Sequence, residues 1–397
     1  MDAGVDVKVL PTERGAQRRA LLQIVEDLRP ALLDGADEAE ATGTLPLATV
    51  DALESAGCFR LKLPAVLGGI EADPVTYLEI IEALAYIHTS AAWTTMTGTT
   101  SIALMGAFLP DDAIEQIFID GHVPRAAAVT PPMGRAEPVG GGYMVSGRWS
   151  FGSGIPHAHW VCGGAFAHPP GGGERVHRLF AVPIDAVEVH DNWQVIGLRG
   201  TGSCDFSIAE RLVPASFSWA YVEDPPRRGG PLYQIRSPGH TANEHAAVVL
   251  GTARRALDAI VEIAESKTSG VHKQNRLAAR QVFQRMIGEA TLRLQSARML
   301  VLDVYERAWS VVSGGEQVPP VLQAEMRGAA ALATAVAVDV TTDAFRYCGG
   351  RALFETGILQ RCLRDVNSAA QHHAVSDVAF ENLGRFVLGD PEADPRS

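Results

Sequence analysis

A stretch rich in glycine, serine and aromatic residues, GRWSFGSGIPHAHW between Gly147 and Trp160, is the part of this chain best suited to contact a flat ligand. Because glycine has no Cβ, the backbone of such a turn can approach a ligand closely. The rings of Trp149 and Phe151 offer faces and edges to that ligand, and Ser153 adds a hydroxyl. The same pattern is typical of an ordinary strand–turn–strand with aromatic core residues, so both interpretations are open for the stretch alone.

Other side chains that could do chemistry lie apart from one another. His157 and His159 flank the aromatic stretch but alternate along it, so they face different ways. His240 and His245 are five residues apart at an expected helix start, which is a poor spacing for a metal pair. No H-x-x-x-H, two-carboxylate or cysteine cluster indicates a metal site, and no G-x-G-x-x-G between a strand and a helix indicates a nicotinamide-binding domain. We therefore predict no metal.

Composition narrows the class of protein. The 397 residues are 47% hydrophobic and 20% charged, as in soluble globular proteins, and are too many for one simple core. The formal charge of -12 argues against nucleic acid or an anionic membrane as a partner. Five cysteines without a C-x-x-C pair favour a reducing compartment. The start MDAGVDVKVLPTERGAQRR has no apolar signal core and no window resembles a membrane span, so we expect a cytoplasmic protein.

The hydrophobic pattern changes twice along the chain. Residues 1–122 read as an N-terminal helical domain, because apolar residues recur at helical spacing. Residues 123–235 alternate with period two between glycines and prolines, which predicts a small β-barrel or sandwich. Residues 236–397 are helical again and read as a four-helix bundle. Its four long segments are 246–266, 276–309, 321–348 and 358–388.

Four motifs occur in order along these domains, and the combination resembles the acyl-CoA dehydrogenase superfamily. The resemblance covers nearly the whole chain and implies that fold, mainly α with a central β domain. The motifs are the leucine-, proline- and glycine-rich segment 45–69, the aromatic stretch 151–160, the run Arg199 to Ser203 followed by Val213 and Pro214, and Gly349-Gly350 followed by Arg364-Asp365.

The resemblance implies a flavin, FMN or FAD, between the β domain and the bundle. Phe151 would lie beside the isoalloxazine ring and the Ser153 hydroxyl near N5, which alternates between acceptor and donor. Arg199 is either a flavin contact or a structural ion pair or loop anchor. The remaining predicted cofactor-binding residues are Trp149, Gly152, Thr201, Ser203, and Gly349 with Gly350, the last two toward the cofactor of a neighbouring subunit.

The dehydrogenases of the superfamily need a carboxylate base to remove a proton α to a thioester. In many of them it lies nine residues after the arginine of the R-D pair, a position that His373 occupies here. Others carry the glutamate on the first bundle helix, near the place of Glu244. An acyl-CoA dehydrogenase or desaturase is therefore the alternative function.

The flavin-dependent monooxygenases with this fold match better. The run RDVNSAAQH from Arg364 ends at His372, the position of their histidine. The resemblance implies the oxygenase component of a two-component enzyme, in which reduced flavin and O2 give a C4a-hydroperoxyflavin that hydroxylates an aromatic or other electron-rich small molecule. Ser153 would help to hold it, and His372 would assist deprotonation of the substrate, since imidazole accepts a proton at cellular pH. His373 is the second candidate, because adjacent residues of a helix diverge by about 100°, and one of the pair could be a core histidine.

Some phenol hydroxylases of this group carry a further histidine after an S-x-x-W motif. Here Ser90 to Trp93 is followed by threonines and no histidine, and Thr99 and Thr100 could form hydrogen bonds at that place. The substrate is therefore either not a simple phenol or is oriented by another group. The resemblance also implies a separate NAD(P)H:flavin reductase as a partner, and a homotetramer that completes the cofactor site between subunits. A non-catalytic flavin-binding or scaffold protein is a third hypothesis.

Overall fold

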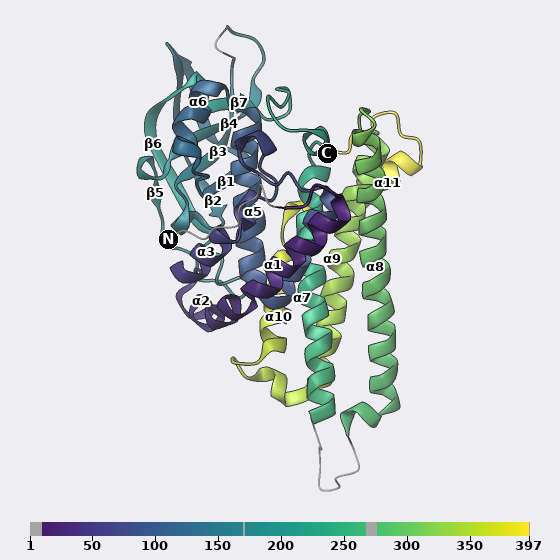
Figure 1. Cartoon of the computed structure of the whole chain (residues 1–397). Helices are drawn as coiled ribbons and strands as arrows, with labels where there is room; N and C mark the ends of the chain where they lie inside the picture. The colour runs from purple at the N-terminus through teal and green to yellow at the C-terminus, as the bar shows by residue number, and fades with distance from the viewer. Residues whose placement is uncertain (1–9, 170, 267–275, 397) are drawn as a thin grey trace.

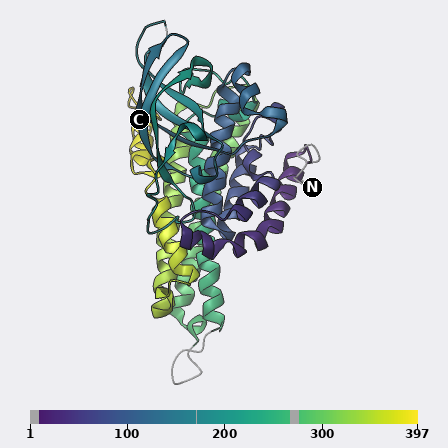
Figure 2. The same cartoon turned by 90° about the vertical axis from the view of Figure 1, so that its left-hand side faces the viewer.

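The computed structural model describes residues 10–169, 171–266 and 276–396. The first nine residues, part of the segment that predicts no signal peptide, lie outside this range. A layer of N-terminal helices, a β-sheet and a bundle of long helices follow one another along the sequence (Figure 1). The sheet lies beside one end of the bundle, and the opposite ends of the long helices extend beyond it (Figure 2). The predicted order of helices, small β domain and helical bundle is confirmed.

The N-terminal helices begin at residues that satisfy their free amides. Asp73 caps α4 by accepting hydrogen bonds from the amides of Val75 and Thr76, and Pro74 occupies the first turn, where no amide is needed. α5 is buried on nearly every side, as its uniformly small and apolar sequence predicts. The helices are α1 (Arg14–Asp34), α2 (Ala36–Thr42), α3 (Leu47–Ser55), α4 (Pro74–Ile87), α5 (Thr89–Phe108) and α6 (Asp111–Ile117).

The strands of the described chain form one seven-stranded mixed sheet in the order β5-β6-β2-β1-β3-β4-β7. Neighbouring strands are antiparallel except β1 and β3, which are parallel. This sheet takes the place of the predicted β-barrel, and its core is shared with the C-terminal half of α5 and with α6. The strands are β1 (Ala126–Val139), β2 (Gly142–Gly152), β3 (Trp160–Ala167), β4 (Val176–Pro183), β5 (Glu188–Val189), β6 (Cys204–Pro214) and β7 (Ser218–Ala220).

The bundle departs from the sequence-based expectation at one point. The single helix predicted over 358–388 is wrong, because the chain is interrupted between α10 and α11. His372 has an extended backbone, with φ −73° and ψ 134°. Arg327 of α9 donates hydrogen bonds to the carbonyls of His373 and Ala374, and so satisfies groups at the interruption. The helices are α7 (Gly239–Ser266), α8 (Gln281–Ser313), α9 (Pro320–Cys348), α10 (Ile358–Ala369) and α11 (Val378–Val387).

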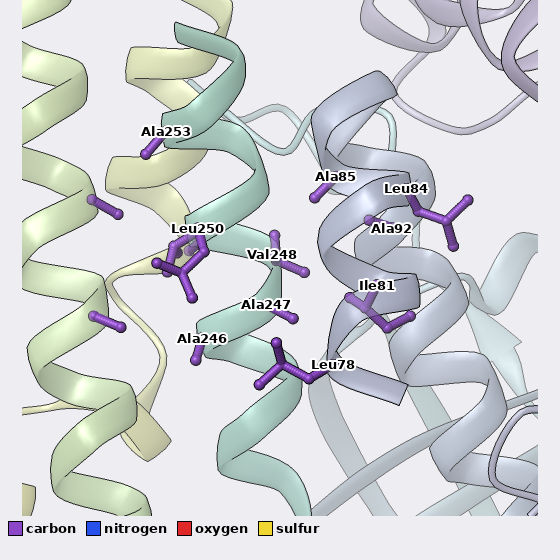
Figure 3. Close-up of a cluster of buried hydrophobic side chains, with 14 of the residues drawn as sticks. Leu78, Ile81, Leu84, Ala85, Ala92, Ala246, Ala247, Val248, Leu250 and Ala253 are labelled. Carbon is purple, nitrogen blue, oxygen red and sulfur yellow. The ribbon is translucent and has the colours of Figure 1, made fainter. Parts of the chain in front are cut away.

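Two hydrophobic cores divide the molecule, and α5 belongs to both. The first half of α5, with α1 and α4, packs against the bundle, and Figure 3 shows side chains of α4 and α7 meeting in that core. The second half, from Ile102 onward, packs against the sheet. The N-terminal helices therefore share cores with both other parts, and the domain boundaries at 122 and 235 stay a prediction.

Among the residues that the structure describes, one helix is apolar enough to be considered as a membrane span. Within Pro320–Leu353 a window reaches a mean hydropathy of 1.2, and 56% of it is buried inside the structure. The α9 part of this segment packs against α7, α8, α10 and α11. A central helix of a bundle has the same composition, and this packing accounts for it.

A buried ion pair ties α4, α5 and α7 to the segment that follows α3. Lys62 Nζ lies 2.8 Å from Glu244 Oε2 and also donates to the His240 carbonyl at 2.9 Å. The hydroxyls of Tyr77 and Thr100 donate to the same Glu244 oxygen at 2.9 and 2.8 Å. Both charged side chains are almost completely buried, so each depends on the other and on these hydrogen bonds.

We expect Glu244→Gln to destabilise the fold by roughly 3 kcal/mol, because it leaves the Lys62 ammonium buried without its counter-charge. Chemical denaturation of the purified protein measures the effect. Asp303→Asn, which breaks the exposed pair of Asp303 with Arg307, should cost less than about 1 kcal/mol. Equal losses of unfolding free energy in the two variants would show that the buried pair stabilises the fold no more than the exposed pair does.

Candidate active site

The turn at the end of β2 separates two aromatic residues that a regular strand would place on one face. Phe151 has φ +70°, which turns its ring outward, and the side chain is 69% exposed. Trp149 is fully buried, stacks on Phe206 at 5.3 Å and donates from Nε1 to the Gly164 carbonyl at 2.8 Å. The prediction that Trp149 binds the cofactor is therefore wrong, and its indole is part of the core of the sheet.

A chain of hydroxyls begins at the same turn. Ser153 Oγ lies 2.7 Å from Ser203 Oγ, which lies 2.7 Å from Thr201 Oγ1. Thr201 Oγ1 donates in turn to the Leu198 carbonyl at 2.8 Å. The structure thus brings together the three hydroxyl residues that the sequence singled out, although Ser153 is about 50 residues from the other two. Because a hydroxyl can donate or accept, this chain can reorient to suit a ligand at Ser153.

Trp93 of α5 joins this turn to the bundle. Its indole Nε1 donates to Ser153 Oγ at 3.0 Å. The same ring meets the His245 ring edge-on at 5.3 Å between centroids and the His372 ring at 6.1 Å. One indole therefore has the predicted serine on one side and two imidazoles on the other. In the sequence Trp93 marks only a motif, with no site role assigned to it.

The two imidazoles are stacked, with ring centroids 4.0 Å apart and planes at 29°. His245 Nδ1 lies 3.0 Å from the Thr241 carbonyl, so that nitrogen must carry a proton. His372 Nδ1 accepts the amide of Ala374 at 3.2 Å, so it must be unprotonated. In the neutral forms of the two rings, the remaining nitrogens therefore differ in whether they carry a proton. His245 Nε2 is an acceptor and His372 Nε2 is a donor.

His245 Nε2 is buried and has no hydrogen-bond partner among the described residues. A buried acceptor left unpaired costs about 1–3 kcal/mol, so this atom fits one that a bound molecule satisfies. Sequence reasoning discarded His245 because it considered only a metal pair. The available signal was a run of polar residues, Asn243 to His245, at the start of an apolar buried helix.

Both imidazoles are held neutral by their surroundings. Burial, and then the neighbouring His245 and His373 rings, lower the pKa of His372 well below its usual range. Burial also lowers the pKa of His245, against the opposing effects of Glu244 and of the Thr241 carbonyl. His373 is exposed, and its ring lies 4.5 Å from that of His372. The two residues lie in the interruption between helices, so the predicted divergence of 100° on a common helix is wrong.

The loop before Thr201 is anchored to α10. Asp365 Oδ1 accepts the Leu198 amide at 2.7 Å, and burial raises the pKa of this carboxyl to about 6. Arg364 donates to Glu40 at 2.6 Å and to the Ile196 carbonyl. Arg199 lies 3.8 Å from the same Glu40, which fits the ion-pair interpretation, and its role toward a cofactor stays a prediction.

Gly349 and Gly350 end α9 at the surface. Gly349 has φ +70°, and a Cβ on either glycine would meet nothing within 4 Å. Open space of this kind allows a further group to approach the backbone. The prediction that these glycines approach the cofactor of a neighbouring subunit is not tested by a single chain and stays a prediction.

The residues at the turn fit a flavin. An exposed aromatic ring at Phe151 lies next to Gly152 and to a hydroxyl chain that can donate or accept, and a flat heteroaromatic ring needs these features. Phe151, Gly152, Ser153, Thr201 and Ser203 would hold it. Among the described residues no group of three or more His, Cys, Asp or Glu side chains could hold a metal ion.

The geometry does not favour the dehydrogenase alternative. Glu244 accepts hydrogen bonds from Lys62, Tyr77 and Thr100 through one oxygen and is 3% exposed. A carboxylate held in this way is occupied and is poorly placed to take a proton from a substrate. The position expected for the other carboxylate base is His373.

Comparisons with known proteins identify the family. The families "Acyl-CoA dehydrogenase, N-terminal domain" and "Acyl-CoA dehydrogenase, C-terminal domain" match residues 17–109 and 244–377. Indole-3-acetate monooxygenase of Pseudomonas putida is 30% identical over 90% of this chain and 92% of its own. The flavin-dependent monooxygenase oxygenase subunit HsaA of Mycobacterium tuberculosis is 28% identical over 96% and 98%.

Solved structures give the same picture. XiaF from Streptomyces sp., in complex with FADH2 and glycerol, superposes with a TM-score of 0.89 at 26% identity and covers 96% of this chain and 98% of its own. The HsaA monooxygenase of M. tuberculosis gives 0.87 at 26% identity, over 96% and 100%.

The chain belongs to the acyl-CoA dehydrogenase superfamily. Within it, this protein is the oxygenase component of a two-component flavin-dependent monooxygenase, as its sequence predicts. Reduced flavin and O2 are accordingly its cofactor and oxidant, and the separate flavin reductase stays a prediction.

The buried imidazoles should make stability depend on pH. A histidine whose pKa is lowered on folding stabilises the fold fully above its unfolded pKa of about 6.5, and that stability is lost as the pH falls. Below that pH we expect the unfolding free energy of the wild type to fall by up to about 1.4 kcal/mol per pH unit for each such histidine. His372→Gln should flatten this dependence below about pH 6.5 in thermal unfolding. His168→Gln, at an exposed position, is the control, and an unchanged slope in His372→Gln would contradict the expectation.

Proposed function

We propose that this oxygenase hydroxylates a small aromatic or other electron-rich molecule that carries an O–H or N–H group. The observation that carries the proposal is the position of the Trp93 indole, between the Ser153 hydroxyl and the stacked His245 and His372 rings. A flavin held at Ser153 and a substrate held by the imidazoles would lie on neighbouring parts of one site. The relative from P. putida, named for indole-3-acetate, supports an aromatic substrate.

The tautomers give the two histidines different roles toward the substrate. His245 Nε2, the unpaired acceptor, takes the proton from the O–H or N–H group of the substrate. This makes the aromatic ring of the substrate more nucleophilic. His372 Nε2 donates a hydrogen bond that orients the substrate or holds the negative charge that develops on it. Reduced flavin, when bound, supplies the electrons that activate O2. Trp93 fixes the Ser153 hydroxyl and excludes water between the two parts of the site.

Assembly and location complete the proposal. Leu353 and Phe354 follow Gly350 and are 75% and 68% exposed, and Val387 and Leu388 at the end of α11 are also exposed. Apolar side chains gathered at helix ends favour burial against other subunits, which supports a homotetramer with the two glycines at a neighbour's flavin. All five cysteines are buried, in keeping with a reducing, cytoplasmic location. FMN and FAD both suit the turn at Ser153.

Ser153→Ala tests the flavin side of the site. Without the hydroxyl, we expect bound reduced flavin to be re-oxidised by O2 roughly fivefold faster, which corresponds to one lost hydrogen bond of about 1 kcal/mol. More of the oxygen should then appear as hydrogen peroxide. Stopped-flow absorbance and a peroxide assay measure the two effects. Ser153→Thr keeps a hydroxyl and should stay near the wild type. Equal rates in all three proteins would place Ser153 away from the flavin.

His245→Gln and His372→Gln test the division of roles with a series of phenols of graded acidity. We expect both variants to lose about tenfold or more of the hydroxylation of weakly acidic phenols. Only His245→Gln should regain activity with 4-nitrophenol at alkaline pH, because that substrate is already ionised and needs no proton acceptor. Rescue of His372→Gln alone would reverse the two roles. Oxidation of added acyl thioesters by bound flavin, without any hydroxylation, would favour the dehydrogenase instead.

A further inference from the structure

A pocket of about 390 Å³ lies between the C-terminal half of α5, the end of β7, the start of α7 and the C-terminal segment. Its volume is in the range of small-molecule sites. Rings and aliphatic side chains make up most of its wall, and none of the residues assigned above to the flavin or to the substrate imidazoles lines it. The ring-bearing residues of the wall are Phe108, His177, Tyr221, Tyr233 and His240.

The pocket is separate from the flavin site. Leu104 on its wall lies eleven residues beyond Trp93 on α5, about 16 Å along the helix axis at 1.5 Å per residue. His240 lies five residues before His245 on α7, about 7.5 Å along that axis. The Lys62–Glu244 pair lies alongside the same part of α7, because Lys62 bonds the His240 carbonyl.

Arg236 places a positive charge on this wall. Its Nη2 donates to the carbonyls of Val222 and Asp224 at 2.9 and 3.0 Å, and its guanidinium lies 5.7 Å from the centre of the Phe108 ring. No Asp or Glu oxygen of the described residues lies within 4.0 Å of it. Arg396, on the same wall, differs because Asp394 neutralises it at 2.9 Å.

Two buried polar atoms of the wall are left without partners in the described chain. They are Arg236 Nη1 and His240 Nε2, and His240 is only 9% exposed. An unpaired buried donor on a cation is more costly than one on a neutral group. A guanidinium with one unpaired nitrogen, next to aromatic rings, suits the carboxylate of an aromatic acid. The ring of that acid can pack on the rings of the wall.

We propose that this pocket is a binding site for a small aromatic carboxylate. The carboxylate accepts hydrogen bonds from Arg236, and the ring packs between Phe108, Tyr221 and Tyr233. The five rings of the wall favour a flat aromatic body over a branched aliphatic one, and the charge of Arg236 excludes an amine of similar shape. The inference concerns binding alone and does not depend on the proposed reaction.

Phenylacetate and its neutral counterpart phenylacetamide test the site, by calorimetric titration of the flavin-free protein. We expect phenylacetate to bind at least about tenfold more tightly, since only it offers a charge to the guanidinium. Arg236→Gln keeps donors for the Val222 and Asp224 carbonyls but removes the charge, and should abolish this preference. Arg236→Lys keeps the charge without the forked geometry and should lose only part of it. Thermal unfolding confirms that each variant is folded.

His372→Gln is the matched control for the flavin site and should bind phenylacetate as the wild type does. Loss of binding in His372→Gln, with binding retained in Arg236→Gln, would assign the acid to the flavin site and overturn the proposal. Equal affinity for the acid and the amide, or no heat with either, would also overturn it. None of these results touches the monooxygenase reaction, which is measured with flavin and O2.

Discussion

The arrangement of the site depends on one hydrogen bond, from the Trp93 indole to the Ser153 hydroxyl. The first half of α5 belongs to the core of the bundle and the second half to the core of the sheet. Trp93 therefore comes from the bundle side, whereas Ser153 belongs to a turn of the sheet. A bond between them fixes the distance between a turn suited to flavin and a pair of imidazoles suited to substrate.

Burial gives this site its chemical character. Histidines in water are partly protonated near neutral pH, but the stacked pair here is kept neutral because burial would leave each cation poorly solvated, and His372 would in addition lie close to two other imidazoles. Only a neutral imidazole can accept a proton. Burial thus keeps the ring neutral, so that a lone pair is available for the substrate proton at ordinary pH, and the two backbone hydrogen bonds decide which ring offers it.

The fold was largely predictable because hydrophobic period and motif order are local properties of a sequence. Ser153, Thr201, Ser203 and His372 were named from the same motifs, and the structure places the three hydroxyls in one chain. The failures come from contacts between distant segments. The helix break at His372 depends on Arg327 of another helix. His245 becomes a site residue only because α7 packs beside that break.

The error at Trp149 has a different cause. A strand alternates with period two, so nothing in the residue types separates Trp149 from Phe151, two rings of the same stretch. The positive φ of Phe151 ends this alternation within the turn, and no residue type at that position announces it, since glycine would be the usual choice.

The carboxylate of Glu244 shows how one fold can serve two kinds of flavin chemistry. A dehydrogenase needs a free base close to the substrate, yet here the carboxylate on the first bundle helix is occupied by Lys62 and two hydroxyls. The next residue, His245, faces the site instead. Adjacent positions on a helix point about 100° apart, so a structural ion pair and a proton acceptor can occupy neighbouring residues without competing. The proton acceptor of this protein is then an imidazole, which suits the activation of a ring for oxygen transfer better than removal of a proton beside a thioester.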